Sequence, residues 1–124
     1  MAKKNDVVHV EIITDILTWI DINICVPLKI NDVAEKAGYS KWHFQRIFHR
    51  VTQRTLANYI RDRKLELAAW DLSNTNDDIS YISYKYGFDS QQSFTRTFSR
   101  KYNIPPSAYR KYNLSRSIPE EISI

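Results

Sequence analysis

Residues 41–51 carry polar and aromatic side chains at a spacing that would place them on one face of a helix. The stripe consists of Trp42, Gln45, Arg46 and His49, which fall at positions i, i+3, i+4 and i+7. A guanidinium can bond a guanine at two points, and a primary amide can do the same with an adenine. Exposure of an indole to water is unfavourable, and contact with a thymine methyl group or a sugar would explain why Trp42 lies on this face. The stripe therefore has the chemistry of a surface that reads base edges.

A second segment, about residues 90–102, repeats this chemistry. The stripe opposite its apolar residues consists of Gln92, Thr95, Arg96 and Ser99. An amide again lies near the start of the helix, with an arginine one turn later. Gln91 and Ser93 lie beside them at the amino-terminal end, which is the end that points at base edges in helix-turn-helix complexes.

Contacts to DNA phosphates are expected from polar residues around the two stripes. Such contacts fix the register of a protein on DNA and supply salt-sensitive affinity, but they read no sequence. The candidates are Lys36, Lys41, His43, Arg50 and Arg61 around the first stripe, and Ser90, Thr97, Arg100, Lys101 and Tyr109 around the second.

Both segments belong to an internal repeat marked by the only two glycines of the chain, Gly38 and Gly87, which lie 49 positions apart. A glycine between two short helices is typical of a helix-turn-helix, because its backbone reaches the positive φ that a sharp turn needs. With one residue inserted after the second glycine, the repeat pairs Ile30 with Ile79, Val33 with Ile82, Phe44 with Phe94, Arg46 with Arg96, Phe48 with Phe98, Arg50 with Arg100 and Tyr59 with Tyr109. The sequence thus predicts two helix-turn-helix units.

Apolar periodicity predicts an all-α chain of seven helices, in which two small units share a long central helix. The expected helices cover about 8–25, 32–38, 41–51, 55–73, 79–86, 90–102 and 107–112, with Asn31 or Asp32, Ser40 and Thr55 as caps. The buried stripes are Phe44, Ile47, Phe48 and Val51, then Leu56, Tyr59, Ile60, Leu67, Ala68 and Leu72, then Phe94, Phe98 and Tyr102. The expected organisation is a first unit at 8–54, a linker helix at 55–73, a second unit at 74–113 and a disordered tail at 114–124.

Positive charge is concentrated in the two repeats. The 124 residues have a formal charge of +4, yet residues 36–63 hold seven basic and one acidic side chain, as do residues 80–116. This distribution favours a polyanionic partner, namely double-stranded DNA. Cys25 is the only cysteine, so no intramolecular disulfide is expected, and no stretch approaches the ~20 apolar residues of a membrane span. A cytoplasmic protein without a membrane partner is expected.

The long helix sets the expected geometry on DNA. About 19 residues at ~1.5 Å rise separate the units by roughly 28 Å, while successive major grooves on one face of B-DNA lie ~34 Å apart. We therefore expect one monomer to place both helices in adjacent grooves of DNA that bends toward the protein. Because the two stripes differ, the expected site is asymmetric.

The motifs around the glycines resemble those of the AraC/XylS family of transcription regulators, and more closely its small stand-alone MarA, SoxS and Rob branch. The resemblance covers about residues 8–113 and rests on Gly38-Tyr39-Ser40-Lys41-Trp42-His43-Phe44-Gln45-Arg46, on Tyr86-Gly87-Phe88-Asp89-Ser90-Gln91-Gln92-Ser93-Phe94-Thr95-Arg96, and on Pro105-Pro106 with Tyr109-Arg110. It implies two helix-turn-helix units joined by a long helix, binding as a monomer to an asymmetric promoter box and contacting RNA polymerase to activate transcription. Base-reading positions of the branch correspond to Trp42, Gln45, Arg46, Gln91, Gln92, Ser93 and Arg96, in agreement with the two stripes.

The resemblance also implies control of genes for antibiotic efflux, reduced uptake and oxidative stress. The branch often has threonine where this chain has Ser93, which removes a methyl group that could touch thymine. The chain has no room for the effector-sensing domain of many larger relatives, so control through synthesis and proteolysis is expected. Residues 114–124 have no clear counterpart.

Three other interpretations compete with a sequence-specific regulator. An enzyme is disfavoured, because His9, His43 and His49 lack metal-ligand spacing and no nucleophile or carboxylate pair accompanies them; no cofactor or metal is expected. A protein-interaction module and an architectural DNA binder without sequence preference both remain open. For single residues, Trp42 could instead pack against the first helix, and Gln45 and Arg46 could be ordinary solvated surface.

Overall fold

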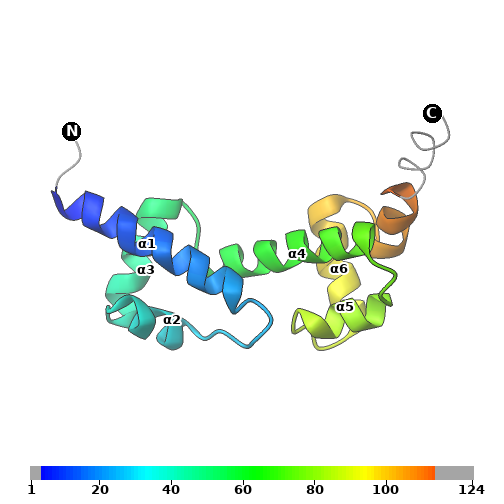
Figure 1. The fold of residues 1–124 in the computed structure, drawn as a ribbon, viewed down its shortest axis with the longest axis horizontal. Coiled ribbons are helices and arrows are strands. Elements are labelled where there is room, and N and C mark those ends of the chain that lie inside the picture. The colour runs from blue at the N-terminus through cyan, green and yellow to red at the C-terminus, as the bar shows by residue number, and fades with distance from the viewer. Residues whose placement is uncertain (1–3, 114–124) are drawn as a thin grey trace. The chain divides into compact units, whose positions relative to one another are not determined.

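The structure, a computed structural model, describes residues 4–113, and within them it consists of helices and connecting turns without a strand. The helices are α1 (Lys4–Ile22), α2 (Ile30–Ala37), α3 (Lys41–Thr52), α4 (Leu56–Asn74), α5 (Ile79–Lys85) and α6 (Gln91–Tyr102), as Figure 1 shows. A seventh helical segment covers 106–113. The predicted all-α fold is confirmed, whereas the predicted tail at 114–124 lies outside the described residues.

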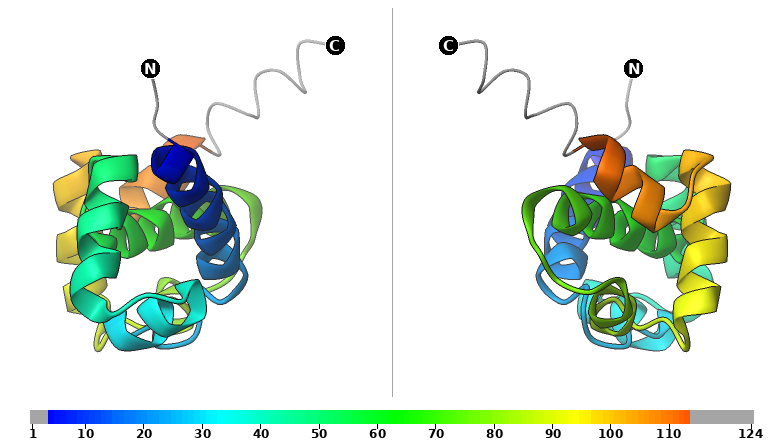
Figure 2. Two further views of the ribbon diagram at one scale, coloured as in Figure 1. Left: turned by 90° about the vertical axis from the view of Figure 1, so that its left-hand side faces the viewer. Right: turned by 90° about the vertical axis from the view of Figure 1, so that its right-hand side faces the viewer.

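The chain divides into two compact units, and the boundary falls between Arg63 and Lys64, within α4. The first unit contains α1, α2, α3 and the amino-terminal part of α4. The second contains the rest of α4, followed by α5, α6 and the segment 106–113. The left view of Figure 2 shows α3 of the first unit from the side, and the right view shows α6 of the second unit in the same way.

In the first unit, α1 packs against both α2 and α3. Its buried residues are spaced as on one helix face, so a single stripe covers the two shorter helices. The core consists of Ile13, Ile16, Ile20 and Ile24, with Val33 and Ala34 from α2, Phe44, Ile47 and Phe48 from α3, and Leu56 from α4. Burial of each large side chain contributes about 1.5–3 kcal/mol relative to exposure.

Helix α1 begins and ends earlier than the predicted 8–25. The bonding pattern changes at Asn23: its backbone N–H is shared between the Trp19 and Ile20 carbonyls, both at 3.1 Å, and the Ile24 N–H donates to the Asp21 carbonyl at 3.4 Å. The Asn23 side chain also donates to the Trp19 carbonyl, at 2.8 Å. Ile24 is buried although it lies beyond the helix, so its place in the apolar pattern reflects the core and not helix length.

The predicted cap of α2 is wrong. The helix begins at Ile30, its N-cap is Lys29, and no side chain caps it. Asp32 instead lies in the first turn, where its charge favours the positive end of the helix dipole. Two other predicted caps are confirmed: the Ser40 hydroxyl accepts from the His43 N–H at 3.3 Å, and the Thr55 hydroxyl accepts from the Asn58 N–H at 3.2 Å.

The two glycine turns have the same hydrogen bonds. Gly38 and Gly87 adopt φ of 84° and 79°. After α2, the N–H groups of residues 38 and 39 donate to the Glu35 and Ala34 carbonyls, both at 3.0 Å. After α5, those of residues 87 and 88 donate to the Tyr84 and Ser83 carbonyls, also both at 3.0 Å. Each turn is therefore a Schellman motif, which reverses the chain and leads it into the third helix of its unit.

The second unit surrounds a chain of aromatic rings. Phe94 contacts Phe88 and Phe98 with ring centroids 5.2 and 5.6 Å apart, and Phe98 contacts Tyr102 and Tyr109 at 4.6 and 5.3 Å. The remaining buried residues are Leu65, Ala68, Ala69 and Leu72 from α4, with Ile82, Tyr86 and Pro106. On α4 the buried stripe thus includes Leu65 and Ala69, which the sequence pattern missed, and Leu67 is only half-buried.

Two polar side chains hold the second unit together in ways that the sequence did not indicate. Asp71 on α4 is only 4% exposed, and its carboxylate accepts from the Tyr86 hydroxyl at 2.8 Å and from Lys85 Nζ at 2.9 Å. Arg110 donates from Nε to the Leu72 carbonyl at 3.0 Å and from Nη2 to the Thr75 carbonyl at 3.3 Å. The first contact ties α4 to the end of α5, and the second caps the carboxyl end of α4 with a residue of 106–113.

Replacement of Asp71 by alanine should destabilise the second unit by about 2–4 kcal/mol, because two buried or half-buried donors lose this acceptor. Urea unfolding followed by circular dichroism would measure the loss. Glu11→Ala, on the exposed side of α1, is the matched control and should change stability by less than about 0.5 kcal/mol. Equal stability of the two variants would contradict the assigned role of Asp71.

Candidate nucleic-acid interface

Helix α3 presents one buried and one exposed face. The Ser40 hydroxyl caps its start, and Phe44, Ile47 and Phe48 anchor its inner face in the core of the first unit. Trp42 lies on the opposite side with 79% of its surface exposed. The alternative in which Trp42 packs against the first helix is therefore excluded.

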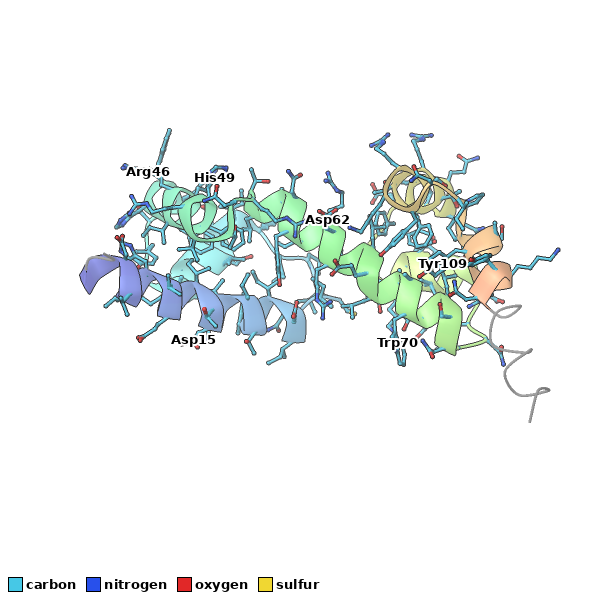
Figure 3. The ribbon with its side chains drawn as sticks, turned by 90° about the horizontal axis from the view of Figure 1, so that it is seen from above. Asp15, Arg46, His49, Asp62, Trp70 and Tyr109 are labelled. Atoms are coloured by element: carbon cyan, nitrogen blue, oxygen red, sulfur yellow. The ribbon has the colours of Figure 1, made fainter. Side chains whose placement is uncertain are left out.

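The exposed face of α3 is shallowly hollowed. The hollow is bordered by Trp42, Gln45, Arg46, His49 and Arg50. Figure 3 shows Arg46 and His49 projecting from α3 on the side away from α1. The indole, the amide, the guanidinium and the imidazole of the predicted stripe therefore lie on one surface.

Helix α6 repeats the arrangement in the second unit. The Ser90 hydroxyl accepts from the Ser93 N–H at 3.0 Å, and Phe94 and Phe98 are fully buried below. A second shallow hollow is bordered by Gln91, Gln92, Thr95 and Arg96. Ser93 is half-buried and does not border this hollow.

The scaffold beneath the two hollows is nearly the same. The Phe44 and Phe48 rings lie 5.6 Å apart at an interplanar angle of 42°, and the Phe94 and Phe98 rings lie 5.6 Å apart at 46°. Arg46 and Arg96 each follow the first phenylalanine of the pair by two positions. The two arginines are therefore presented in equivalent positions by equivalent packing.

Around α3, the five candidates for phosphate contact are all exposed. Two of them have partners within the protein: Arg50 Nη1 lies 3.4 Å from Asp6 Oδ1, and Arg61 Nε lies 3.7 Å from Asp62 Oδ1. The His43 ring meets that of Tyr39 edge-on at 4.9 Å. Lys36 borders a different hollow, between α1 and α2, with Ile12, Asp15, Ile16, Trp19 and Ala37.

Around α6, the candidates divide into exposed and half-buried residues. Ser90, Arg100 and Lys101 are exposed, whereas Thr97 and Tyr109 are half-buried. The Thr97 hydroxyl donates to the Ser93 carbonyl at 2.9 Å, and the Tyr109 ring packs against Phe98 and Tyr102 at 5.3 Å. These two residues therefore also serve the structure of the unit.

The structure adds two residues to the hollows that the sequence assigned to no contact. His49 borders the first hollow and Thr95 the second. Both already lay on the exposed stripes, His49 after the residues expected to read bases and Thr95 between Ser93 and Arg96. Their spacing was the available signal, and the hollows show that they share a surface with the arginines.

The part of the chain that the structure describes contains neither a candidate metal site nor a membrane-spanning helix. Within residues 4–113, histidine, cysteine, aspartate and glutamate side chains form no group of three or more that could hold a metal ion. In the same range no helix is both long and apolar enough to cross a bilayer.

Comparison with known sequences identifies the family. The sequence model described as a helix-turn-helix domain matches residues 33–112. The transposon Tn10 TetD protein of Escherichia coli is 51% identical over 86% of this chain and 77% of its own length. The multiple antibiotic resistance protein MarA of E. coli K12 is 45% identical over 82% of this chain and 80% of its own length. The regulatory protein SoxS of the same strain is 49% identical over 82% of this chain and 95% of its own length.

Solved structures share the fold. A transcriptional regulator with an AraC-type DNA-binding domain from Chromobacterium violaceum has a TM-score of 0.79 and 26% identity, covering 83% of this chain and 92% of its own. The DNA-binding domain of AdpA, a global transcriptional factor solved in complex with a target DNA, has a TM-score of 0.78 at 19% identity, covering 83% and 93%. The resemblance seen around the two glycines is confirmed. The chain belongs to the AraC/XylS family of helix-turn-helix transcription regulators, as a relative of the small regulators MarA and SoxS.

Proposed function

We propose that this protein is a sequence-specific transcription activator that binds DNA as a monomer through both α3 and α6. One observation carries the proposal: each helix buries a phenylalanine pair and exposes an amide and an arginine on a hollowed outer face. The fold is shared with AdpA, whose DNA-binding domain was solved with a target DNA.

Seven residues are proposed to read bases. The arginines would bond guanine and the glutamines adenine, each at two points, because their donor and acceptor geometry fits those bases in the major groove. Trp42 and Ser93 would make apolar or single hydrogen-bond contacts beside them. The seven are Trp42, Gln45, Arg46, Gln91, Gln92, Ser93 and Arg96.

Ten further residues are proposed to contact phosphates. Helix caps and exposed cations around the reading helices are suited to this role, because backbone N–H groups and cations attract phosphate oxygens. Ser90 can cap α6 and bind a phosphate at the same time, because its hydroxyl accepts from the Ser93 N–H and still has a proton to donate. The set is Lys36, Lys41, His43, Arg50, Arg61, Ser90, Thr97, Arg100, Lys101 and Tyr109.

The proposed binding site on DNA is asymmetric and spans two adjacent major grooves. Helix α4 has 19 residues, which at ~1.5 Å per residue gives roughly 28 Å, short of the ~34 Å between grooves on one face. Bending of the DNA toward the protein would close that gap. The two hollows are lined by different side chains, so the two half-sites are expected to differ in sequence.

The proposed targets are genes of multidrug and oxidative stress resistance. Its relatives, the multiple antibiotic resistance protein MarA and the regulatory protein SoxS, support this assignment. Activation would require contact with RNA polymerase, as the branch implies.

The central experiment is selection of bound duplexes from a random DNA pool at physiological salt. Two unlike half-sites about one helical turn apart would support the proposal. Selected duplexes that bind no tighter than scrambled DNA would instead support an architectural binder, and absence of DNA binding would support a protein-interaction module.

Replacement of Arg46 or Arg96 by alanine should relax preference at one base pair each and weaken binding to the selected duplex by about 1–3 kcal/mol. Lys41→Ala is the matched control, because loss of a phosphate contact should weaken selected and scrambled duplexes about equally. Fluorescence anisotropy on both duplexes measures the ratio. If Arg46→Ala weakens both duplexes equally, Arg46 does not read sequence.

The DNA in the complex should be bent toward the protein. In a permutation assay, the mobility of the complex should depend on the position of the site within fragments of equal length. Mobility independent of position, with both grooves protected by the protein, would argue that the units reach the two grooves without bending the DNA.

A further inference from the structure

We propose that His49 is a further DNA contact, and that its imidazole takes up a proton when the protein binds, so that affinity rises as the pH falls from 8 to 6. The inference rests on the proposed use of α3 as a reading helix. It assigns a contact, and a dependence on pH, to a residue outside the base-reading and phosphate-contacting sets above.

His49 lies on the surface that would face DNA. It is exposed and borders the same hollow as Arg46 and Arg50. It follows Arg46 by three positions, so the two side chains are neighbours on one helix face (Figure 3). The His49 backbone carbonyl accepts from the Gln53 N–H at 2.8 Å, whereas no residue among 4–113 forms a hydrogen bond, ion pair or ring contact with its imidazole. Its ring nitrogens are therefore available to a ligand.

The chemistry of imidazole makes this contact sensitive to pH. Histidine is the side chain that changes charge between pH 5 and 8, and its protonated ring offers two N–H donors and a positive charge. Phosphate oxygens stabilise that cation, so the complex holds more protons than the unbound protein. Affinity is then greatest at the acidic end of the range and falls as the pH rises, until the ring is neutral in the complex as well.

The charges around His49 come from its own helix and from the elements packed against it. On its own helix they are the cations Arg46 and Arg50. From α1, Asp6 pairs with Arg50. From the α4 side, Asp62 pairs with Arg54 and Arg61. The nearby carboxylates are thus engaged with arginines, and DNA would supply the negative charge.

Two other groups of titratable side chains lie on α3 or on the segments around it. The first is the ring cluster of His9, Tyr39 and His43, in which His43 meets Tyr39 at 4.9 Å and His9 at 6.2 Å. The second is the charged set of α2, which is Asp32, Glu35 and Lys36. Both groups are unchanged in variants of His49, so their contributions cancel when those variants are compared.

The test compares wild type with His49→Gln, which is always neutral, and His49→Lys, which is always charged in this range. Fluorescence anisotropy would give the Kd for the selected and the scrambled duplex at pH 6, 7 and 8 and constant ionic strength. Wild type should bind about three- to fivefold tighter at pH 6 than the neutral variant, and match it at pH 8. The lysine variant should match wild type at pH 6 and bind about three- to fivefold tighter at pH 8. Circular dichroism at each pH checks that all three proteins are folded.

The outcomes separate this inference from the proposed function. If His49→Gln keeps the wild-type ratio of Kd between pH 8 and pH 6 on both duplexes, the His49 contact is wrong, whatever the sequence preference. If wild type shows no preference for the selected duplex, sequence-specific binding is wrong, and the ratio on scrambled DNA still decides whether His49 contacts phosphate. If neither duplex binds at any pH, both proposals fail.

Discussion

Burial of a phenylalanine pair on the inner face of each reading helix is the constraint on which the rest of the structure depends. Phe44 and Phe48 lie one turn apart, as do Phe94 and Phe98, and all four are fully buried. With 3.6 residues per turn, fixing one stripe of a helix in a core also fixes which residues face outward. Arg46 and Arg96, two positions after the first ring of each pair, are therefore held away from the core, and no polar contact within residues 4–113 orients either side chain.

The duplication thus preserved a scaffold while the outward residues diverged. Both units keep the glycine turn with the same two hydrogen bonds, the serine cap and the ring pair. On the outer faces, however, Trp42 corresponds to Gln92 and Gln45 to Thr95, while only the arginine is shared. Core positions tolerate little change in volume, whereas exposed positions cost little to vary. A repeat in the protein consequently gives no reason to expect a repeat in the DNA.

What the sequence could predict follows from the range of each interaction. Glycine turns, the Ser40 cap and the two outer stripes depend on residues within about one turn of each other, and all were predictable from spacing. Asp71 and Arg110 could not be recognised, because their partners lie 15 and 38 residues away and only the folded unit brings them together. The end of α1 was missed for the same reason, since Ile24 continues the apolar pattern into a turn that the core buries.

The polar contacts of the first helix in each unit show where the two copies have become different. Asp21 and Asp71 are 50 positions apart, near the ends of α1 and α4. Asp71 is buried and binds Tyr86 and Lys85, within its own helix-turn-helix. Asp21 instead accepts from Arg63 Nε at 3.1 Å, and its side chain is 36% exposed. Asp71 therefore joins α4 to the end of α5 within the second unit. In the first unit the corresponding carboxylate, that of Asp21, binds the part of α4 where the unit ends. A partly exposed ion pair contributes little to stability by itself, but Tyr59 adds two contacts between α4 and the first unit: its hydroxyl donates to Asp21 Oδ1 at 3.5 Å, and its ring lies 5.9 Å from that of Phe48.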